Sequence, residues 1–481
     1  MPLILPGNVG SATAATGFNV ANSCRFDSAS SADLRISDYS GAGTSRKTRT
    51  YSMWIKRSEL SYAVIFGSAG KDHWVFTADH KIQINIGSGT DSRRITDMVF
   101  RDVSAWYHIV FAYDTTQGTA ANRFTMWVNG AVATTSIVAG KNEVAEDEEA
   151  LVFINGDTST IGSDEDSASY FDGYMAEWVF VDGQKLDADS FGEYDEDSGI
   201  WKPIDVSGIT LGTNGFYLDF KTASDLGIDA GNDNDFEPTN LAATDQSLDT
   251  CTNNQCVLNG ILLPNSEPAT FSQGNTAIVQ NGNWRSYAGT FGLTSGKWYF
   301  EADGSGTAGT VLYGIASLEA INLQDKTASN LNYTIGLNQP AYAYHGSSGG
   351  MYHSTSSANA QGQGGGSWGA AFNSSNLISV YIDLDNNKLY TAKDNTMNVS
   401  GTGYDIEAGF TYFPVVVAYS VTTALNFGNG EFNGTAVSSA VADANGFGAF
   451  EYDPSRGGGS DFDGAAKDFL AICTKNLAEY G

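Results

Sequence analysis

The sequence predicts an all-β protein built from two antiparallel β-sandwiches in tandem. Stretches of alternating apolar and polar residues, each of strand length, recur at intervals of roughly 8 to 12 residues. Turn-forming residues separate them, and the 481-residue chain has 55 Gly but only 9 Pro. Hydrophobic residues make up 41% of the chain and charged residues 17%, a mix that favours strands and turns over charge-laced helices.

The first predicted sandwich spans residues 21–222. Within it, Asn129 and Gly130 end one strand, and their tolerance of positive φ predicts a tight hairpin turn with residues 131–138 as the returning strand. The strands expected in this domain are 49–58, 62–68, 73–79, 81–87, 107–114, 124–130 and 174–183.

Residues 223–270 are dense in Asp, Asn, Thr and Ser, which predicts a polar connector with a domain boundary inside it. A second sandwich follows over residues 271–435. Residues 345–368 are rich in Gly and Ser, and we expect a long surface loop there, where binding commonly resides. The strands expected in this domain are 296–303, 310–317, 377–395, 412–420 and 423–430.

Short elements are expected at both ends. Residues 1–20 open on a short apolar stretch bounded by Pro2 and Pro6, which needs a cover and therefore predicts an arm that makes an assembly contact. Residues 436–481 form a C-terminal segment with a short helix at 465–477, whose apolar residues could share one face. No secretory signal is evident, and no apolar run approaches the roughly 20 residues that span a bilayer, so no membrane insertion is expected.

The charge balance excludes one class of partner. With 25 Lys and Arg against 55 Asp and Glu, the formal net charge is 25 − 55 = −30, and such a chain repels nucleic acid. Oxygen-rich loops can bind hard cations, so Asp157, Asp164 and Asp166 form a candidate Ca²⁺ site. Solvated acidic loops explain the same residues. No cofactor is required by any motif.

The sequence argues against catalysis. Glu177 lies in a strand without the second carboxylate that glycoside hydrolysis needs. The histidines lack metal-binding spacing, and no nucleophile-elbow motif is present. Cys251 and Cys256 could close a loop or bind a metal, but no second Cys or His pair lies nearby to complete a zinc site, which favours two ordinary thiols in a turn-rich connector. We therefore expect a protein that is not an enzyme.

Aromatic residues in and around the 345–368 segment are the candidate ligand-binding group. Flat rings stack on sugar faces, and the interleaved amides could add hydrogen bonds. Packing of the loop or a subunit contact would use the same side chains. The residues are Tyr342, Tyr344, His345, Tyr352, His353 and Trp368.

The first predicted sandwich resembles concanavalin A-like, laminin-G-type domains. The resemblance rests on a strand with Trp54, the Trp-Tyr-His sequence at 106–108, the WVNG hairpin at 127–130 and the closing strand at 171–177. It implies a jelly-roll fold. Domains of that family often hold a calcium ion at one rim, but its ligands cannot be matched residue by residue here.

The second predicted sandwich resembles SPRY (B30.2-like) domains. The sequences GKWYFE at 296–301, YGIA at 313–316, ISVYIDLDNNKLYTAKDN at 378–395 and LNFGNGEF at 425–432 follow one another as in that family. Such domains bind partners through loops at one end of the sandwich, and neither family requires catalysis.

Besides the two sandwiches, three segments stand out: MPLILPGNVGSATA at 1–14, PTNLAATDQSLDTCTNNQ at 238–255 and FLAICTKNL at 469–477. The whole arrangement resembles virion structural proteins of marine tailed bacteriophages. It implies a tail-fibre or appendage protein on the particle surface, with lectin-like domains that attach to a host glycan or receptor. A capsid decoration or head-fibre protein is the alternative, and a glycan-degrading enzyme the third. Other virion proteins are the expected partners, and virion symmetry favours a homo-oligomer.

Overall fold

The computed structural model describes most of the chain. The described residues are 17–37, 39, 41–68, 72–86, 91–164, 169–262, 269–282, 284–304, 310–322, 339–355, 358–363, 368–456 and 461–481, with backbone alone for 355 and 358–363. The chain divides into two compact units. We call residues 14–254 the N-terminal unit and residues 255–481 the C-terminal unit.

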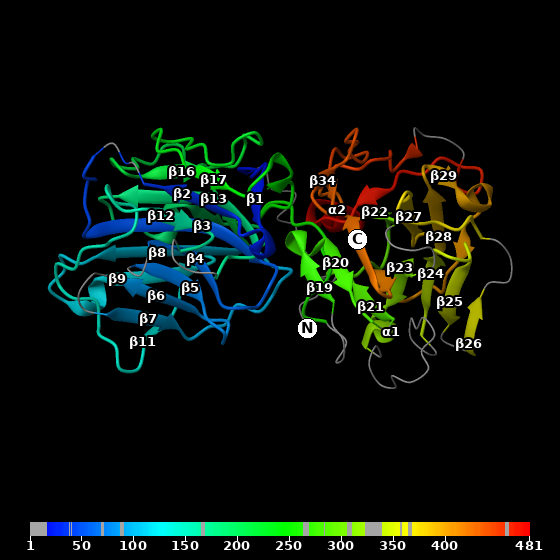
Figure 1. Ribbon diagram of the computed structural model, residues 1–481, viewed down its shortest axis with the longest axis horizontal. Coiled ribbons are helices and arrows are strands. Elements are labelled where there is room, and N and C mark those ends of the chain that lie inside the picture. The colour runs from blue at the N-terminus through cyan, green and yellow to red at the C-terminus, as the bar shows by residue number, and fades with distance from the viewer. Residues whose placement is uncertain are drawn as a thin grey trace. The chain divides into compact units, whose positions relative to one another are not determined.

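In the part of the N-terminal unit that the structure describes, two eight-stranded antiparallel sheets form the fold (Figure 1). The first, called the β3 sheet, has the order β10 (Ala131–Val132), β9 (Phe124–Val128), β8 (Tyr107–Asp114), β3 (Thr48–Arg57), β13 (Gly173–Asp182), β1 (Ser23–Phe26) and β18 (Gln246–Ser247), with β16 (Phe216–Leu218) also on β13. The second has the order β11 (Thr135–Ile137), β7 (Ser92–Thr96), β6 (Ile82–Ile86), β5 (His73–Phe76), β4 (Ala63–Ser68), β12 (Ser159–Ile161), β2 (Asp33–Ile36) and β17 (Glu237–Thr239).

Alternation along β3 shows how the sequence builds this unit. Tyr51, Met53 and Ile55 belong to the main aromatic-rich core, whereas Trp54 belongs to a second cluster on the other face of the β3 sheet. Residues after β13 pack over that second face, including the hairpin of β14 (Gly192–Tyr194) and β15 (Trp201–Pro203). The β3 sheet is therefore buried on both faces.

The predicted Asn-Gly hairpin is confirmed. Asn129 and Gly130 have φ values of +48° and +77°, as a primed turn requires. The returning segment does not stay in one sheet, however. β10 pairs with β9, whereas β11 pairs with β7 in the opposite sheet, so residues 131–138 connect the two layers at the rim of the sandwich.

The described C-terminal unit also contains two main antiparallel sheets (Figure 1). One has the order β19 (Thr270–Ser272), β20 (Ala277–Gln280), β32 (Val421–Asn426), β22 (Lys297–Asp303), β27 (Leu377–Asp383), β28 (Lys388–Lys393) and β29 (Thr396–Met397), with β30 (Tyr404–Asp405) on β28 and β35 (Leu470–Ala471) on β22. The other has the order β21 (Arg285–Ala288), β31 (Tyr412–Ala418), β23 (Val311–Ser317), β24 (Ala341–His345), β25 (Met351–Thr355) and β26 (Ala358–Gln363).

The remaining described elements are short. A two-stranded ribbon joins β33 (Glu431–Phe432) to β34 (Thr435–Ala436). The α-helices are α1 (Leu318–Asn322) and α2 (Thr474–Tyr480). The 3₁₀ turns are η3 (Ser28–Ser30), η4 (Ala120–Asn122), η5 (Ala188–Ser190), η6 (Ala243–Asp245), η7 (Gln273–Asn275) and η8 (Asn398–Gly401). The predicted all-β fold class is confirmed.

The expected connector at 223–270 is not a separate segment. β17 and β18 pair with strands of the N-terminal unit, and the boundary between the units falls after Asn254. Few large apolar side chains are needed there because backbone pairing and polar side-chain contacts hold the segment. The arm expected at 1–20 lies outside the described residues except for 17–20.

Two other predicted elements differ in the structure. The helix expected at 465–477 begins only at Thr474, because Leu470 and Ala471 pair in parallel with β22 and Cys473 is extended. The long loop expected at 345–368 contains β25 and β26 instead, which add two strands to the edge of a sheet. Gly and Ser composition concealed these strands because backbone pairing needs no large side chain.

Candidate functional site

The six aromatic residues predicted as one binding group lie on two faces of the C-terminal unit. Tyr342 and Tyr344 of β24 point into the sandwich core and are buried. His345 of the same strand and Tyr352 of β25 pack together on the outer side of the sheet, with ring centroids 4.7 Å apart. The expected exposed cluster is therefore wrong for Tyr342 and Tyr344, because strand alternation points them into the core. It is also wrong for His345, which is buried on the outer side of the sheet against Tyr352.

His353 and Trp368 do lie together, at a partly exposed place that includes a residue absent from the prediction. Tyr404 of β30 contacts both, with ring centroids 5.7 Å from His353 and 5.4 Å from Trp368. All three side chains are half-buried. We call His353, Trp368 and Tyr404 the edge ring cluster, because it joins β25 of one sheet to β30 at the edge of the other.

Hydrogen bonds hold the rings of this cluster in place. The Trp368 Nε1–H donates to Thr391 Oγ1 at 2.8 Å, and the Tyr404 hydroxyl lies 2.9 Å from His353 Nδ1. Beneath them, Tyr342 packs 5.9 Å from Tyr404. The Trp368 indole N–H, the Tyr404 hydroxyl and His353 Nδ1 are therefore engaged inside the protein.

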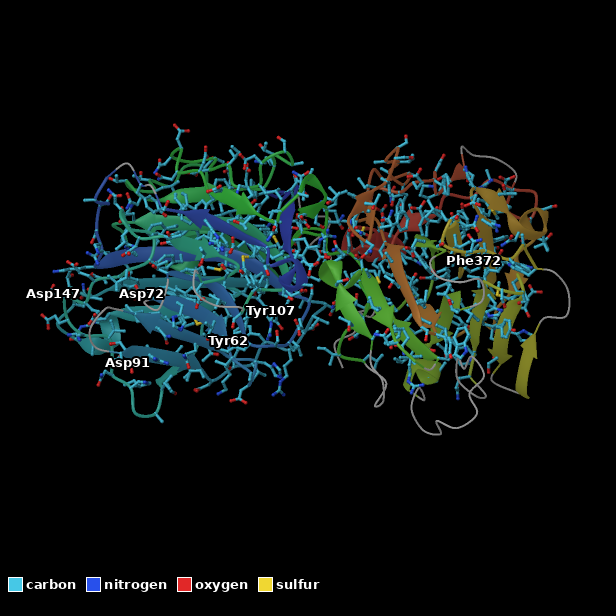
Figure 2. The ribbon with its side chains drawn as sticks, viewed as in Figure 1. Tyr62, Asp72, Asp91, Tyr107, Asp147 and Phe372 are labelled. Atoms are coloured by element: carbon cyan, nitrogen blue, oxygen red, sulfur yellow. The ribbon has the colours of Figure 1, made fainter. Side chains whose placement is uncertain are left out.

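The segment that carries Trp368 is fastened to the core. Phe372, labelled in Figure 2 among the strands of the C-terminal unit, stacks on Tyr313 and packs against Tyr344. The backbone N–H of Gly369 donates to the Gly349 carbonyl at 2.7 Å. Trp368 is thus presented by an anchored segment.

Burial keeps the edge ring cluster uncharged near neutral pH. Burial lowers the pKa of His353, so its imidazole is neutral. Burial and the nearby Asp405 raise the pKa of the Tyr404 hydroxyl, which stays protonated. Such a neutral aromatic surface suits an uncharged ligand better than a strongly anionic one.

The residues predicted as a calcium site do not form a complete one in the described part of the chain. Asp157 and Asp164 are both half-buried, and Asp166 lies outside the described residues. Among the residues that the structure describes, no group of three or more His, Cys, Asp or Glu is placed to hold a metal ion.

Other acidic side chains of the N-terminal unit are paired with bases at its surface. Asp91 and Asp147 lie at its periphery in Figure 2. Asp91 is paired with Lys141, and Asp147 is paired with Lys47. Such exposed pairs contribute little to the stability of the fold, because water and salt screen them. The acidic loops therefore include ion pairs and are not purely solvated charge.

A serine and a histidine lie together under the hairpin of β14 and β15 but do not form a nucleophile and base. The Trp201 Nε1–H donates to His108 Nδ1 at 2.8 Å, which leaves the imidazole proton on Nε2, 2.9 Å from Ser52 Oγ. Burial lowers the pKa of His108 to about 3. A neutral imidazole that donates to the serine cannot remove its proton.

Glu177 is a buried carboxyl group with a left-handed backbone conformation. It lies at a bulge in β13 with φ of +49°, and Tyr217 donates to its Oε2 at 2.5 Å. Burial raises the pKa of Glu177 to about 7. Strained, buried acids occur at functional sites more often than elsewhere.

Comparison with known proteins supports the lectin-like architecture of the N-terminal unit. Residues 28–189 match the model of the concanavalin A-like lectin/glucanases superfamily. Residues 28–189 are thus similar to that superfamily. Comparison of the sequence with curated proteins gives no match.

The cysteines, including Cys251 and Cys256, are free thiols.

Solved structures with a similar fold share little sequence with this chain. A suggested carbohydrate-binding protein from Bacteroides ovatus is 14% identical over 46% of this chain and 58% of that one, with a TM-score of 0.33. The match therefore spans less than two thirds of that protein. A pentraxin from Limulus polyphemus is 15% identical over 35% and 80% of the two chains, with a TM-score of 0.24. The SPRY domain of human HERC1 is 13% identical over 33% and 91%, with a TM-score of 0.25.

Tyr404 is the site residue that sequence reasoning missed. It lies in a Gly-rich stretch, GTGYDIEAG, between predicted strands, and forms only a two-residue strand. A lone aromatic residue between glycines was the available signal. Its ring is brought to His353 only by the pairing of β30 with β28, which no local pattern specifies.

Proposed function

We propose that the protein is a non-enzymatic glycan-binding protein and that the edge ring cluster is its binding site. The observation that carries the proposal is the meeting of three half-buried rings from separate segments, each with a polar atom held by a hydrogen bond inside the protein. Ring faces fixed in this way can stack on the C–H face of a sugar without first losing side-chain freedom.

The presence of a concanavalin A-like domain supports the same class of ligand. That superfamily includes lectins, and the solved protein from Bacteroides ovatus is described as carbohydrate-binding. The neutral state of His353 favours neutral glycans. A calcium ion at the loop with Asp157 and Asp164 remains part of the proposal, and a Ca²⁺-dependent rise in melting temperature would support it.

Glycan arrays followed by titration calorimetry test the binding site. We expect Trp368→Ala and Tyr404→Ala each to weaken binding about 5-fold to 30-fold, since the loss of one stacked ring costs about 1 to 2 kcal/mol. Tyr352→Ala is the matched control, because Tyr352 neighbours His353 on β25 but faces the other side of the sheet. Wild-type affinity in both cluster variants would refute the site.

We also propose that the protein is a component of a tailed-phage virion, as a surface appendage. The order of the two sandwich types and the net charge of −30 support this location, because like-charged copies stay soluble on an outer surface. Immunogold labelling of purified particles is the test. Label on the tail supports an appendage, label on the capsid supports a decoration protein, and unlabelled particles contradict both.

A glycan-degrading activity is the second candidate, and Glu177 is the observation that favours it. A buried acid with a pKa near 7 can act as a proton donor. Release of reducing ends from host polysaccharide, lost in Glu177→Gln, would establish this activity and displace the non-enzymatic proposal. Unchanged polysaccharide would exclude it.

A further inference from the structure

Three reactive side chains are buried together in the N-terminal unit, in residues that the proposed glycan site does not use. Lys56 of β3 places its Nζ 2.7 Å from Asp249 Oδ2 and 2.7 Å from Asn254 Oδ1. The side chains of Lys56 and Asp249 are 1% and 2% exposed. An amine, a carboxylate and a carboxamide thus meet where little water reaches them.

Neighbouring groups orient each member of this trio. The Trp106 Nε1–H donates to Asp249 Oδ1 at 3.0 Å, while Oδ2 faces the amine. The Asn254 amide nitrogen donates to the Ser104 carbonyl at 2.6 Å, while its oxygen faces Lys56. The carbon next to that oxygen is consequently held close to the Lys56 nitrogen.

We propose that Lys56 and Asn254 become joined by an isopeptide bond, with Asp249 as the proton carrier. Asp249 first accepts a proton from the Lys56 ammonium, which frees the lone pair of Nζ. Nζ attacks Asn254 Cγ, and a C–N bond forms as the carbonyl opens to a tetrahedral intermediate. The Cγ–Nδ2 bond then breaks as the carbonyl re-forms.

Protons balance without any further reactant. Nδ2 takes a proton from the protonated Asp249 and departs as ammonia. The excess proton on Nζ is transferred to this ammonia, so that one ammonium ion is released overall. Asp249 ends as the carboxylate it was at the start. No group is oxidised or reduced, and the new amide carries one hydrogen on Nζ.

Burial provides the physical reason for the reaction. Proton transfer from Lys56 to Asp249 removes two charges at once from a site of low polarity, where isolated charges are costly. The Tyr174 ring, 5.6 Å from Nζ, is part of the apolar wall. Fixed neighbours also replace a bimolecular encounter with an intramolecular one, which raises the effective concentration greatly.

The bond would connect residues far apart in sequence. Lys56 and Asn254 are separated by 198 positions, and Asn254 is the last residue of the N-terminal unit. A cross-link of that span restricts the unfolded chain strongly. It would also anchor the chain to a central strand at the point where it leaves the unit.

Mass spectrometry of the full-length wild-type protein tests the proposal. We expect the denatured protein to weigh less than its sequence by one ammonia, and a tryptic digest to contain a branched peptide that joins uncleaved Lys56 to Asn254. A protein of full sequence mass overturns the proposal. So does a loss of ammonia without the branched peptide, because that outcome places the loss at another residue.

Variants assign the roles of the three residues. Lys56→Arg and Asp249→Asn should retain their full sequence masses, whereas Asn254→Asp should lose one water and give the same branched product. Lys221→Arg, at an exposed lysine, is the control and should still lose ammonia. A branched peptide that persists in Lys56→Arg overturns the assignment. Circular dichroism shows which variants are folded. If Lys56→Arg or Asp249→Asn does not fold, the branched product of Asn254→Asp still tests the proposal.

Discussion

The pKa of Glu177 depends strongly on the burial of its side chain. In the unfolded chain its pKa is about 4.3, whereas burial raises it to about 7 in the folded state. Between these pH values the folded state holds a proton that the unfolded state has released. The stability gained from this proton is complete below about pH 4.3 and is lost as the pH rises through 7.

Replacement of Glu177 by Gln tests this linkage. We expect the variant to lose less stability than the wild type between pH 5 and pH 8, by about 3 kcal/mol, since one pKa unit corresponds to about 1.4 kcal/mol. Denaturant unfolding at each pH gives the values. Glu196→Gln removes the same charge from an exposed position and should leave the slope unchanged. Equal slopes in Glu177→Gln and the wild type would contradict the prediction. Burial raises the pKa of Asp172 to about 7 as well, so part of the slope should remain in Glu177→Gln.

At the scale of elements, the turn before β25 determines where Trp368 lies. Gly349 has φ of +64°, and a Cβ added there would lie 2.1 Å from the Gly369 carbonyl oxygen. The same two residues are joined by a backbone hydrogen bond. A side chain at position 349 must therefore displace the segment that presents Trp368 to Tyr404.

Gly349→Ala should consequently lower both stability and glycan binding. We expect a loss of about 2 to 4 kcal/mol from the clash and the positive φ together, with at least a 10-fold weaker glycan affinity. Gly409→Ala is the matched control, because its φ is +85° but nothing lies within 4 Å of the added Cβ. It should lose only about 1 to 2 kcal/mol and bind normally. Equal glycan affinities in Gly349→Ala and Gly409→Ala would show that the turn at Gly349 does not affect the glycan site.

At the scale of the whole molecule, each unit has its own core. The main aromatic cluster of the N-terminal unit ends at Phe236, and that of the C-terminal unit begins at Cys256. Backbone pairing of β17 and β18 completes the N-terminal unit before the boundary. Two folding units are the expected consequence.

A fragment of residues 14–254 should therefore fold without the rest of the chain. We expect one cooperative transition by circular dichroism, at a melting temperature within a few degrees of the corresponding transition in the full chain. A fragment that ends at residue 222, the boundary predicted from sequence, should be much less stable because it lacks β17, β18 and the partner of Lys56. Equal stability of the two fragments would contradict this account.

The fold class, most long strands and the Asn129-Gly130 turn could be predicted from the sequence, because alternation and turn chemistry are local properties. The sequence also pointed to Trp368 and His353. The tertiary structure decided which aromatic residues stay accessible, since alternation on β24 buries Tyr342 and Tyr344 while sheet pairing brings Tyr404 to the edge. It also decided the meeting of Lys56 with Asn254 across 198 positions. Contacts between distant segments depend on strand order, and no local pattern of residues predicts strand order.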